Sequence, residues 1–497
     1  MDEFIGKHGG VIHGALSCFD RMLFRGSLPI MSGGAMAEFL QVKGVHRWGL
    51  KTFLLAQAAR LKMHAMEMAA AAGRPYQYLG ERTRKEDLAR QIAERDRIDE
   101  GLVCVFALLE VSRTFSLAWK ERTSFVQSTR RKCLQLYYYF VDRELGLIHV
   151  KLQTWFPFQM QVYLNGHEWL ARRLDRRGVK YLKVDNAFVG LSDVESAQQI
   201  SDQFPSVDWV RVLGRYARRI NPLLKELLRP REYYWVTAPA EYSTDILFRR
   251  RANLHDLMPR LLEYSTLYFG AKDVMSFLGR KLVGQFRGEV VTDNRENDLA
   301  GQRLPGRRVK HRAKFNWIKR YDKAGTVLRV ETVINQPEEF RVRRRLRRNG
   351  KWTPVWGPMR KGVAFLFRYP QVAAQSNARY LDALACVDDP TPGHPRARRH
   401  HSRRHLPERQ EVAALQPSLP RRPHPSSKSC SRASTPCTAS PTATSERSSG
   451  APHSPSPTTP TSSPARSPGS CAGCTLTASS PRSLAHAAGV SPSAVAG

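Results

Sequence analysis

The stretch RRVKHRAKFNWIKRYDKAGTVLRVETVINQPEEFRVRRRLRR, residues 307–348, decides the fold that the sequence predicts. Apolar residues alternate with polar ones on both sides of a break at residues 322–325, which read Asp-Lys-Ala-Gly. Alternation with a period of two around a glycine-containing break is typical of a β-hairpin. Most polar positions of this stretch are Arg or Lys. We therefore expect a strand pair with one apolar side against a core and one basic side toward phosphate.

Outward from this hairpin, composition divides the chain of 497 residues into a body and a tail. From Thr391 onward there is no Phe, Trp or Tyr, and Ser, Pro, Arg, Ala, Thr and His predominate. Such a segment buries too little apolar surface to offset its chain entropy, so we expect residues 391–497 to be disordered. The abrupt change after Pro390 leaves two origins open, a natural low-complexity tail and a frameshift in a GC-rich gene.

The body, residues 1–390, alternates between strand and helix patterns. Consecutive strand patterns with short breaks between residues 101 and 166 favour an antiparallel sheet with helices packed on it. We therefore expect an α+β fold, an antiparallel sheet with packed helices and helical insertions, followed by the disordered C-terminal tail. The expected divisions are an N-terminal α+β domain (1–166), a mainly helical region (167–286), a basic hairpin with a C-terminal helix (287–390) and the tail (391–497).

The individual elements follow from periodicity and from breaker residues. Strands are expected at residues 16–28, 101–110, 113–120, 134–142, 145–156, 158–166, 181–184 and 288–293, in the hairpin and in its extension over 339–346. Helices are expected at residues 35–42, 48–71, 83–99, 167–173, 193–203, 209–228, 252–267, 271–278 and 361–384. Residues 232–249 read as two extended pieces around Pro239, Thr83 and Glu86 as a capping box, and Pro370 as an interruption of the last helix.

Charge indicates the class of partner. The chain has a formal net charge of +35, and the tail, with 13 Lys or Arg against 3 Asp or Glu, contributes +10, which leaves +25 on the body. Residues 303–351 alone hold 17 Lys or Arg against 4 acidic residues. This concentration favours a polyanionic partner, DNA first and RNA as the alternative. No signal peptide and no long apolar run is evident, so we expect a cytoplasmic protein without a membrane partner.

One candidate chemistry is metal-dependent phosphodiester cleavage or strand transfer. Such sites bring two or three carboxylates together to hold Mg²⁺ or Mn²⁺, which orients the attacking oxygen and neutralises the phosphoryl group. Carboxylates near predicted strand ends are Asp20, Asp185, Glu241, Asp245, Glu289, Asp293 and Glu331. Of these, the expected catalytic set is Asp20, Asp185, Asp245, Asp293 and Glu331, with Asp185, Asp245 and Glu331 as metal ligands.

A second candidate is nicking by a tyrosine, whose hydroxyl attacks a DNA phosphate and becomes covalently linked. Tyr321 in the basic hairpin is the best-placed nucleophile. The body lacks the His-x-His pattern of a histidine–metal nicking enzyme, which counts against that class.

A third candidate is binding without catalysis, in which cations hold phosphates and aromatic rings stack on bases. Trp352 and Trp356 lie in a Pro- and Gly-containing segment beside the run RVRRRLRR and are candidates for stacking. The expected nucleic-acid contacts are Arg307, Arg308, Lys310, Arg312, Lys314, Lys319, Arg320, Lys323, Arg329, Arg343, Arg344, Arg345, Arg347, Arg348 and Trp352.

Four strings carry a resemblance to a known family. CFDRMLFRGSL, LQTWFPFQMQVYLNGHEWLARRL, EYSTDILFR and IKRYDKAGTVLRVETVIN together resemble uncharacterised bacterial proteins associated with mobile or repeated genes, over most of residues 10–388. The last string also looks like a segment of filamentous-phage-type replication initiators. That resemblance implies that Tyr321, Lys323, Arg329 and Glu331 lie in a sheet close to nucleic acid.

Together these features predict a DNA-binding protein of a mobile genetic element, transposase-like or replication-initiator-like, with metal-dependent cleavage or strand transfer as its chemistry. The alternative is a DNA- or RNA-binding protein without catalysis.

Overall fold

The structure is a computed structural model that describes residues 1–120, 123–228, 232–281, 290–296, 307–348 and 350–388. Residues 389–497, where the disordered tail is expected, lie outside these ranges, as does Glu289. In the described ranges, no helix combines the length and the apolar character needed to cross a bilayer.

Helices and strands alternate along the described chain. The helices are α1 (Asp2–His8), α2 (Gly33–Val42), α3 (Leu50–Ala71), α4 (Lys85–Arg95), α5 (Gly166–Arg177), α6 (Val194–Ser201), α7 (Trp209–Ile220), α8 (Arg251–Tyr268), α9 (Ala271–Phe277) and α10 (Arg368–Leu384). The strands are β1 (Ile12–Ser27), β2 (Tyr76–Tyr78), β3 (Gly101–Lys120), β4 (Thr123–Asp142), β5 (Gly146–Gln153), β6 (Met160–Asn165), β7 (Tyr181–Val184), β8 (Ala187–Leu191), β9 (Tyr234–Phe248), β10 (Val290–Glu296), β11 (Arg307–Ala313), β12 (Asn316–Lys323), β13 (Val327–Ile334), β14 (Arg341–Arg348) and β15 (Lys351–Pro358).

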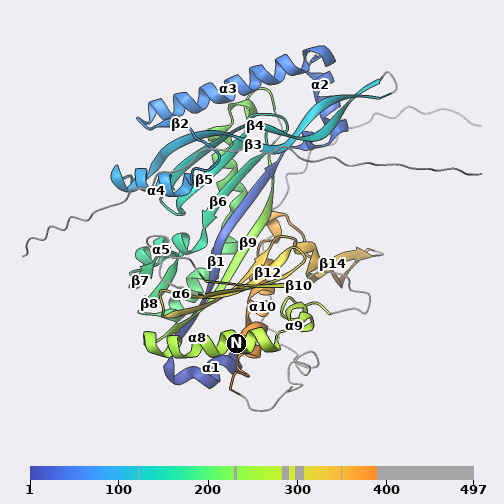
Figure 1. Ribbon diagram of the computed structural model, residues 1–497. Coiled ribbons are helices and arrows are strands. Elements are labelled where there is room, and N and C mark those ends of the chain that lie inside the picture. Colours follow the sequence, from blue (N-terminus) through green and yellow to red (C-terminus); the bar gives the residue numbers. More distant parts are fainter. Residues whose placement is uncertain (121–122, 229–231, 282–289, 297–306, 349, 389–497) are drawn as a thin grey trace, which may run out of the picture. The chain divides into compact units, whose positions relative to one another are not determined.

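Eleven of these strands form one sheet in the order β10-β11-β12-β13-β9-β1-β6-β5-β4-β3-β2 (Figure 1). Every neighbouring pair is antiparallel except β2 and β3, which are parallel. The predicted α+β fold with a mainly antiparallel sheet is thereby confirmed. Each of the expected divisions 1–166, 167–286 and 287–390 contributes at least one strand to this sheet. The expected domain boundaries therefore fall between strands of one sheet.

The hairpin predicted around residues 322–325 is formed by β12 and β13. Ala324 and Gly325 at its turn have φ of 54° and 73°, the left-handed pair that a tight hairpin turn requires. On the apolar side of the hairpin, Ile318, Leu328 and Val330 are buried in a cluster with residues of α8 and α10. The strand expected at 339–346 does not extend this hairpin, because β14 pairs with β15 in a separate two-stranded sheet.

Several element boundaries differ from the prediction for identifiable reasons. The two strands expected over residues 101–120 form one long strand, β3, which pairs with β4 along its whole length. Residues 234–248 likewise form one strand, because Pro239 lies beside an irregularity in the pairing with β1 and beyond the last residue that pairs with β13. Helix α4 begins at Lys85 after Arg84, so Thr83 does not cap it. Pro370 lies in the first turn of α10, where no intrahelical N–H bond is lost.

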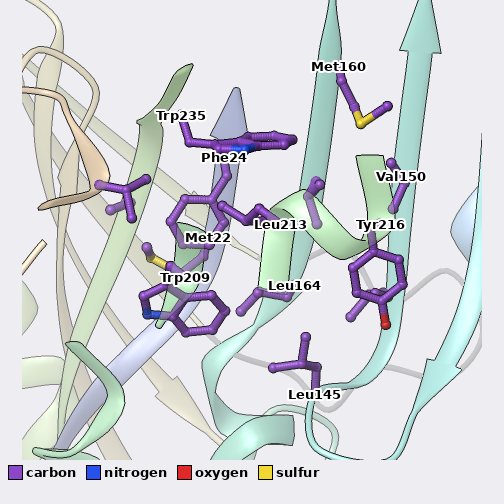
Figure 2. Close-up of a cluster of buried hydrophobic side chains, with 14 of the residues drawn as sticks. Met22, Phe24, Leu145, Val150, Met160, Leu164, Trp209, Leu213, Tyr216 and Trp235 are labelled. Carbon is purple, nitrogen blue, oxygen red and sulfur yellow. The ribbon is translucent and has the colours of Figure 1, made fainter. Parts of the chain in front are cut away.

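The largest buried cluster anchors the central strands β1, β6 and β5 to helix α7. Figure 2 shows Trp209 and Leu213 of α7 beside Met22 and Phe24 of β1, and Tyr216 of α7 beside Val150 of β5. Met160, Leu164 and Trp235 belong to the same cluster. The rings of Phe24 and Trp209 are stacked, with centroids 5.1 Å apart. The burial of this apolar surface fixes β1 against the core. Asp20 lies on the same strand, two residues before Met22.

Candidate functional site

One side of the sheet between β11 and β9 is lined by charged residues that the strand register places in rows. Lys310 pairs with Lys319, Lys319 with Glu331, and Glu331 with Ser243, so their side chains point to the same side of the sheet. A second row runs through Arg308, Tyr321, Arg329 and Asp245. We call this side the polar face and define it by Arg308, Lys310, Arg312, Lys319, Tyr321, Lys323, Arg329, Glu331, Glu241 and Asp245.

A bulge in β1 brings Asp20 to the polar face. Phe19 pairs with Tyr242 and Met22 pairs with Ala240, so two residues, Asp20 and Arg21, lie opposite the single residue Glu241. A bulge of this kind redirects side chains locally. Asp20 is almost fully buried and lies beside Arg329, 309 positions away in the sequence.

Four carboxylates gather around this bulge, and we call Asp20, Glu241, Asp245 and Glu331 the carboxylate centre. One oxygen from each of Asp20, Glu241 and Glu331 lies within 4.8 Å of the other two. The Lys319 ammonium donates hydrogen bonds to Glu331 Oε1 at 2.6 Å and to Glu241 Oε1 at 3.1 Å. Tyr321 donates its hydroxyl to Glu331 Oε2 at 2.6 Å.

The Arg329 guanidinium holds the other half of the carboxylate centre. Its Nε and Nη2 donate to the two oxygens of Asp245 at 2.7 and 2.6 Å, and its Nη1 donates to Asp20 Oδ2 at 3.1 Å. All three side chains are buried. Burial opposes ionisation, but the charge of Arg329 holds the pKa of Asp245 below its ordinary value. The pair is therefore charged, and the fixed fork of Arg329 sets the spacing of two carboxylates.

Helix α5 and the β7–β8 turn complete the centre. Asn165 caps α5 by accepting from the backbone N–H of His167 at 2.8 Å, and its amide donates to Asp20 Oδ1 at 2.9 Å. A Cβ on Gly166 would lie 2.2 Å from the Phe19 carbonyl oxygen, so only glycine allows this approach of α5 to β1. From the β7–β8 turn, Asn186 donates to both oxygens of Asp20 and its backbone carbonyl accepts from Arg329.

His167 fills the space between these groups. Its Nε2 lies 2.9 Å from Arg329 Nη2 and 3.1 Å from the thiol of Cys18. Its Nδ1 is buried, has no hydrogen-bond partner among the described residues, and lies 3.6 Å from Asp20 Oδ1.

Glu241 is the member of the carboxylate centre whose ionisation is opposed by its surroundings. Burial and the charge of Glu331 raise the pKa of Glu241 to about 8. Three hard oxygen donors in this arrangement suit Mg²⁺ or Mn²⁺, and an added cation would share Glu241 and Glu331 with the Lys319 ammonium.

The outer part of the polar face is cationic and half-exposed. Lys310 lies 3.6 Å above the centre of the Trp317 ring, and Arg308 and Arg312 flank it on β11. Burial, together with the charges of Lys319 and Arg308, lowers the pKa of Lys310. Such crowding of like charges is relieved when an anion arrives.

The expected catalytic and metal-binding residues are only partly brought together. Asp20, Asp245 and Glu331 lie in the carboxylate centre. Of the expected metal ligands Asp185, Asp245 and Glu331, only Glu331 belongs to the group of three oxygens that could share a cation, which Asp20 and Glu241 complete, while Asp245 is bound by Arg329. The side chain of Asp185 is 70% exposed at the β7–β8 turn and pairs with Lys323 at 3.2 Å. Asp293 lies on β10 opposite Lys310, and three other strands separate β10 from β9. Tyr321 is next to the centre, but burial and Glu331 raise the pKa of its hydroxyl well above its ordinary value.

The expected nucleic-acid contacts separate into three groups. Arg320 and Arg329 are completely buried and cannot contact a partner, because Arg320 points to the apolar side of the hairpin and Arg329 is enclosed by the carboxylate centre. Lys314 is exposed at the β11–β12 turn, and Arg308, Lys310, Arg312, Lys319 and Lys323 belong to the polar face. Arg343, Arg344, Arg345, Arg347 and Trp352 belong to the β14–β15 pair, while the side chains of Arg307 and Arg348 lie outside the described part.

Sequence reasoning missed His167, Asn165, Asn186 and the structural role of Lys319. The available signal was the Asn-Gly-His sequence at 165–167, in which a capping residue directly follows a strand. The bulge at Asp20 left no comparable signal.

The comparisons with known proteins assign no family. No family model and no curated protein matches the chain. Among solved structures, the crystal structure of the di-domain ARO/CYC BexL from the BE-7585A biosynthetic pathway aligns with 60% of this chain and 91% of its own, at 9% identity and a TM-score of 0.14. A likeness this low carries no argument about fold or function, so function has to be argued from the site.

Proposed function

We propose that the protein binds nucleic acid, DNA in the first place, on the polar face, as a transposase-like or replication-initiator-like protein of a mobile genetic element. The observation that carries this proposal is the row of half-exposed cations on β11 that runs in register into the carboxylate centre. Cations at this density attract phosphates and release their counterions. The resemblance of the hairpin string to mobile-element proteins supports the same assignment.

Binding to labelled DNA duplexes over a range of salt concentrations tests the proposal. The double variant Arg308→Gln/Lys310→Gln should bind more weakly and reduce the slope of log K against log salt by about two, since each phosphate contact contributes about 0.9. The matched control Lys51→Gln/Lys62→Gln removes two exposed cations from α3 and should leave the slope unchanged. If the two variants changed the slope equally, binding would depend only on the overall charge of the protein, and a defined binding face would be refuted.

A second candidate function, cation-dependent cleavage of a phosphodiester, is favoured by the grouping of Asp20, Glu241 and Glu331 beside these cations. Asp20 and Glu331 are buried, so a phosphate would reach this group at Glu241, its partly exposed member. In hydrolysis, a water oxygen forms a bond to phosphorus while a bridging P–O bond breaks. A carboxylate oxygen of the centre that the cation leaves free would accept the water proton, and the leaving oxygen takes a proton from solvent. A divalent cation held by these carboxylates would orient the phosphate and neutralise its charge.

Nicking of supercoiled plasmid with Mg²⁺, with Mn²⁺ and with a chelator tests cleavage. Glu331→Gln should abolish cation-dependent nicking while leaving DNA binding within about threefold, because the phosphate contacts that set the affinity come from exposed cations, whereas Glu331 is buried on β13, two strands from the cations of β11. Tyr321→Phe distinguishes the two chemistries, since a tyrosine nucleophile leaves a protein–DNA adduct stable to detergent and water attack leaves none. Nicking that survives in Glu331→Gln would exclude the carboxylate centre as the active site. If wild type binds without nicking, the alternative of binding without catalysis holds.

A further inference from the structure

The strands β14 and β15 form a ribbon whose two sides differ sharply. The register pairs Arg343 with Trp356, Arg345 with Pro354 and Arg347 with Trp352, so these six residues share one side, and Arg341 extends it. All seven are exposed, with Trp352 and Trp356 at 64% and 65%. We call this side the arginine–tryptophan face.

The root of the ribbon is fixed to the core, so the arginine–tryptophan face is held on a defined support. Phe340 and Met359 are buried in the main cluster, and Met359 N–H donates to the Phe340 carbonyl at 2.9 Å. On the opposite side, Arg344 lies against Gly357, where an added Cβ would be 2.4 Å from Nε. In Figure 1, β14 extends to the right of β12 and β10.

The chemistry of this face fits one kind of ligand. Residues 341–358 hold seven Lys or Arg and no Asp or Glu, which favours a polyanion. Exposed indoles contribute binding energy only where flat apolar surfaces reach them, and the bases of a duplex are already stacked on each other. Unpaired nucleotides offer base faces and phosphates together.

The spacing of the rings agrees with an extended strand. Trp352 and Trp356 are four residues apart on one strand, about 13 Å at about 3.3 Å per residue. Consecutive stacked bases, about 3.4 Å apart, cannot occupy two rings at that distance. A single strand whose bases are unstacked from one another can place two separated bases on the two rings. The arginines opposite β15, Arg343, Arg345 and Arg347, would then contact the phosphates between those bases.

We propose that the arginine–tryptophan face binds single-stranded nucleic acid by stacking Trp352 and Trp356 on unpaired bases. The proposal rests on the proposed function, because it specifies which form of nucleic acid one part of the protein takes. An anionic membrane is the main rival for an arginine- and tryptophan-bearing surface. It is disfavoured because this face presents two indoles, Pro354 and, opposite Arg341, Pro358, and no aliphatic side chain, too little apolar surface to enter a lipid interface.

The test measures binding of the full chain to a labelled 16-nucleotide single strand, as DNA and as RNA, and to the corresponding DNA duplex. Trp352→Ala/Trp356→Ala should weaken single-strand binding by about tenfold or more and change duplex binding by less than about threefold. Trp352→Phe/Trp356→Phe, which keeps two rings, should restore part of the loss. Trp48→Ala, an exposed tryptophan elsewhere, is the matched control and should have no effect.

The outcomes separate the two proposals. If wild type binds neither duplex nor single strand, the proposed function fails and the inference fails with it. If duplex binding depends on Arg308 and Lys310 while single-strand binding is indifferent to both tryptophans, the inference alone is overturned. Equal losses on duplex and single strand would also overturn it, as would tryptophan-dependent binding to phosphatidylserine vesicles without single-strand binding. If the affinities for the DNA and RNA single strands differ, the tighter one identifies the type of nucleic acid that this face binds.

Discussion

At the scale of single residues, two arginines nine positions apart in the same hairpin have opposite surroundings. Arg329 is surrounded by acceptors from Asp20, Asp245 and Asn186. Arg320 is equally buried, but its Nε and Nη1 have no partner among the described residues, and its Nη2 reaches only Ser265 Oγ at 3.3 Å. Burial accordingly lowers the pKa of Arg320.

This contrast predicts opposite effects of the same substitution. Arg329→Met should lower the free energy of unfolding by about 3–5 kcal/mol, because it leaves buried carboxylates without their cation. Arg320→Met should leave that free energy within about 1 kcal/mol of wild type or raise it, because it removes a buried charge that lacks a carboxylate partner. Urea unfolding of the two variants provides the measurement. A loss of similar size in both would contradict the assignment of Arg320 to an uncompensated position.

Glu241 gives the pH dependence of stability a defined sign. Its pKa is about 8 in the folded protein, against about 4.3 for an unfolded glutamate. Between these values the folded state keeps a proton that the unfolded chain has lost, so its contribution to stability is full below about pH 4.3 and is lost as pH rises toward 8.

Glu241→Gln should therefore flatten the decline in the free energy of unfolding between pH 5 and pH 8 by at least about 1.4 kcal/mol, the equivalent of one pKa unit. Urea titrations at the two pH values measure it, with Glu94→Gln on the exposed side of α4 as the control. A variant whose pH profile matches wild type would show that Glu241 titrates normally.

At the scale of elements, the β12–β13 turn determines the register of the polar face. Gly325 has φ of 73°, and a Cβ there would lie 2.5 Å from Arg251 Nε. Gly350, at the end of β14, has φ of 76°, but a Cβ there would have nothing within 4 Å. A substitution at Gly350 therefore introduces backbone strain alone, whereas a substitution at Gly325 adds a steric clash with Arg251.

We expect Gly350→Ala to lower the free energy of unfolding by about 1 kcal/mol, the cost of a side chain in the left-handed region. Gly325→Ala should cost more, because Arg251 must also move away from the turn. Thermal unfolding of both variants measures the difference, and a Gly325→Ala loss no larger than that of Gly350→Ala would show that Arg251 moves freely.

The elements were largely predictable from the sequence, whereas the carboxylate centre was only partly so. Alternation and an Asp-Lys-Ala-Gly break were enough for the hairpin, because a period of two is a local property. The same alternation separates Ile318 and Arg320 from Lys319 and Tyr321, so the burial of Arg320 could have been inferred from it. The approach of Asp20 to Glu241 depends on a bulge and on pairing between distant strands, which no local pattern reports.

At the scale of the whole molecule, the sheet joins the beginning and the end of the described chain. Strand β9 pairs with β1 on one side and with β13 on the other. A fragment of residues 1–286 would expose the β13 edge of β9 and leave Asp20 and Asp245 without Arg329.

We therefore expect the fragment 1–286 to lack a cooperative unfolding transition, while a fragment of residues 1–388 keeps one. Circular dichroism during urea titration of the two fragments, with hydrogen exchange of β1 amides, is the measurement. A cooperative 1–286 fragment with protected β1 amides would show that this region folds independently.

The contact between Asp20 and Arg329 also determines when the carboxylate centre can form during translation. Arg329 follows Asp20 by 309 positions, which take roughly 15–60 s to translate at about 5–20 residues per second. During that interval β1 can pair with β6, but the acidic residues of β1 and β9 must stay hydrated until the last strands leave the ribosome. The charged centre is thus the latest part of the sheet to close, and a nascent chain cannot acquire the proposed activity before its binding strands exist.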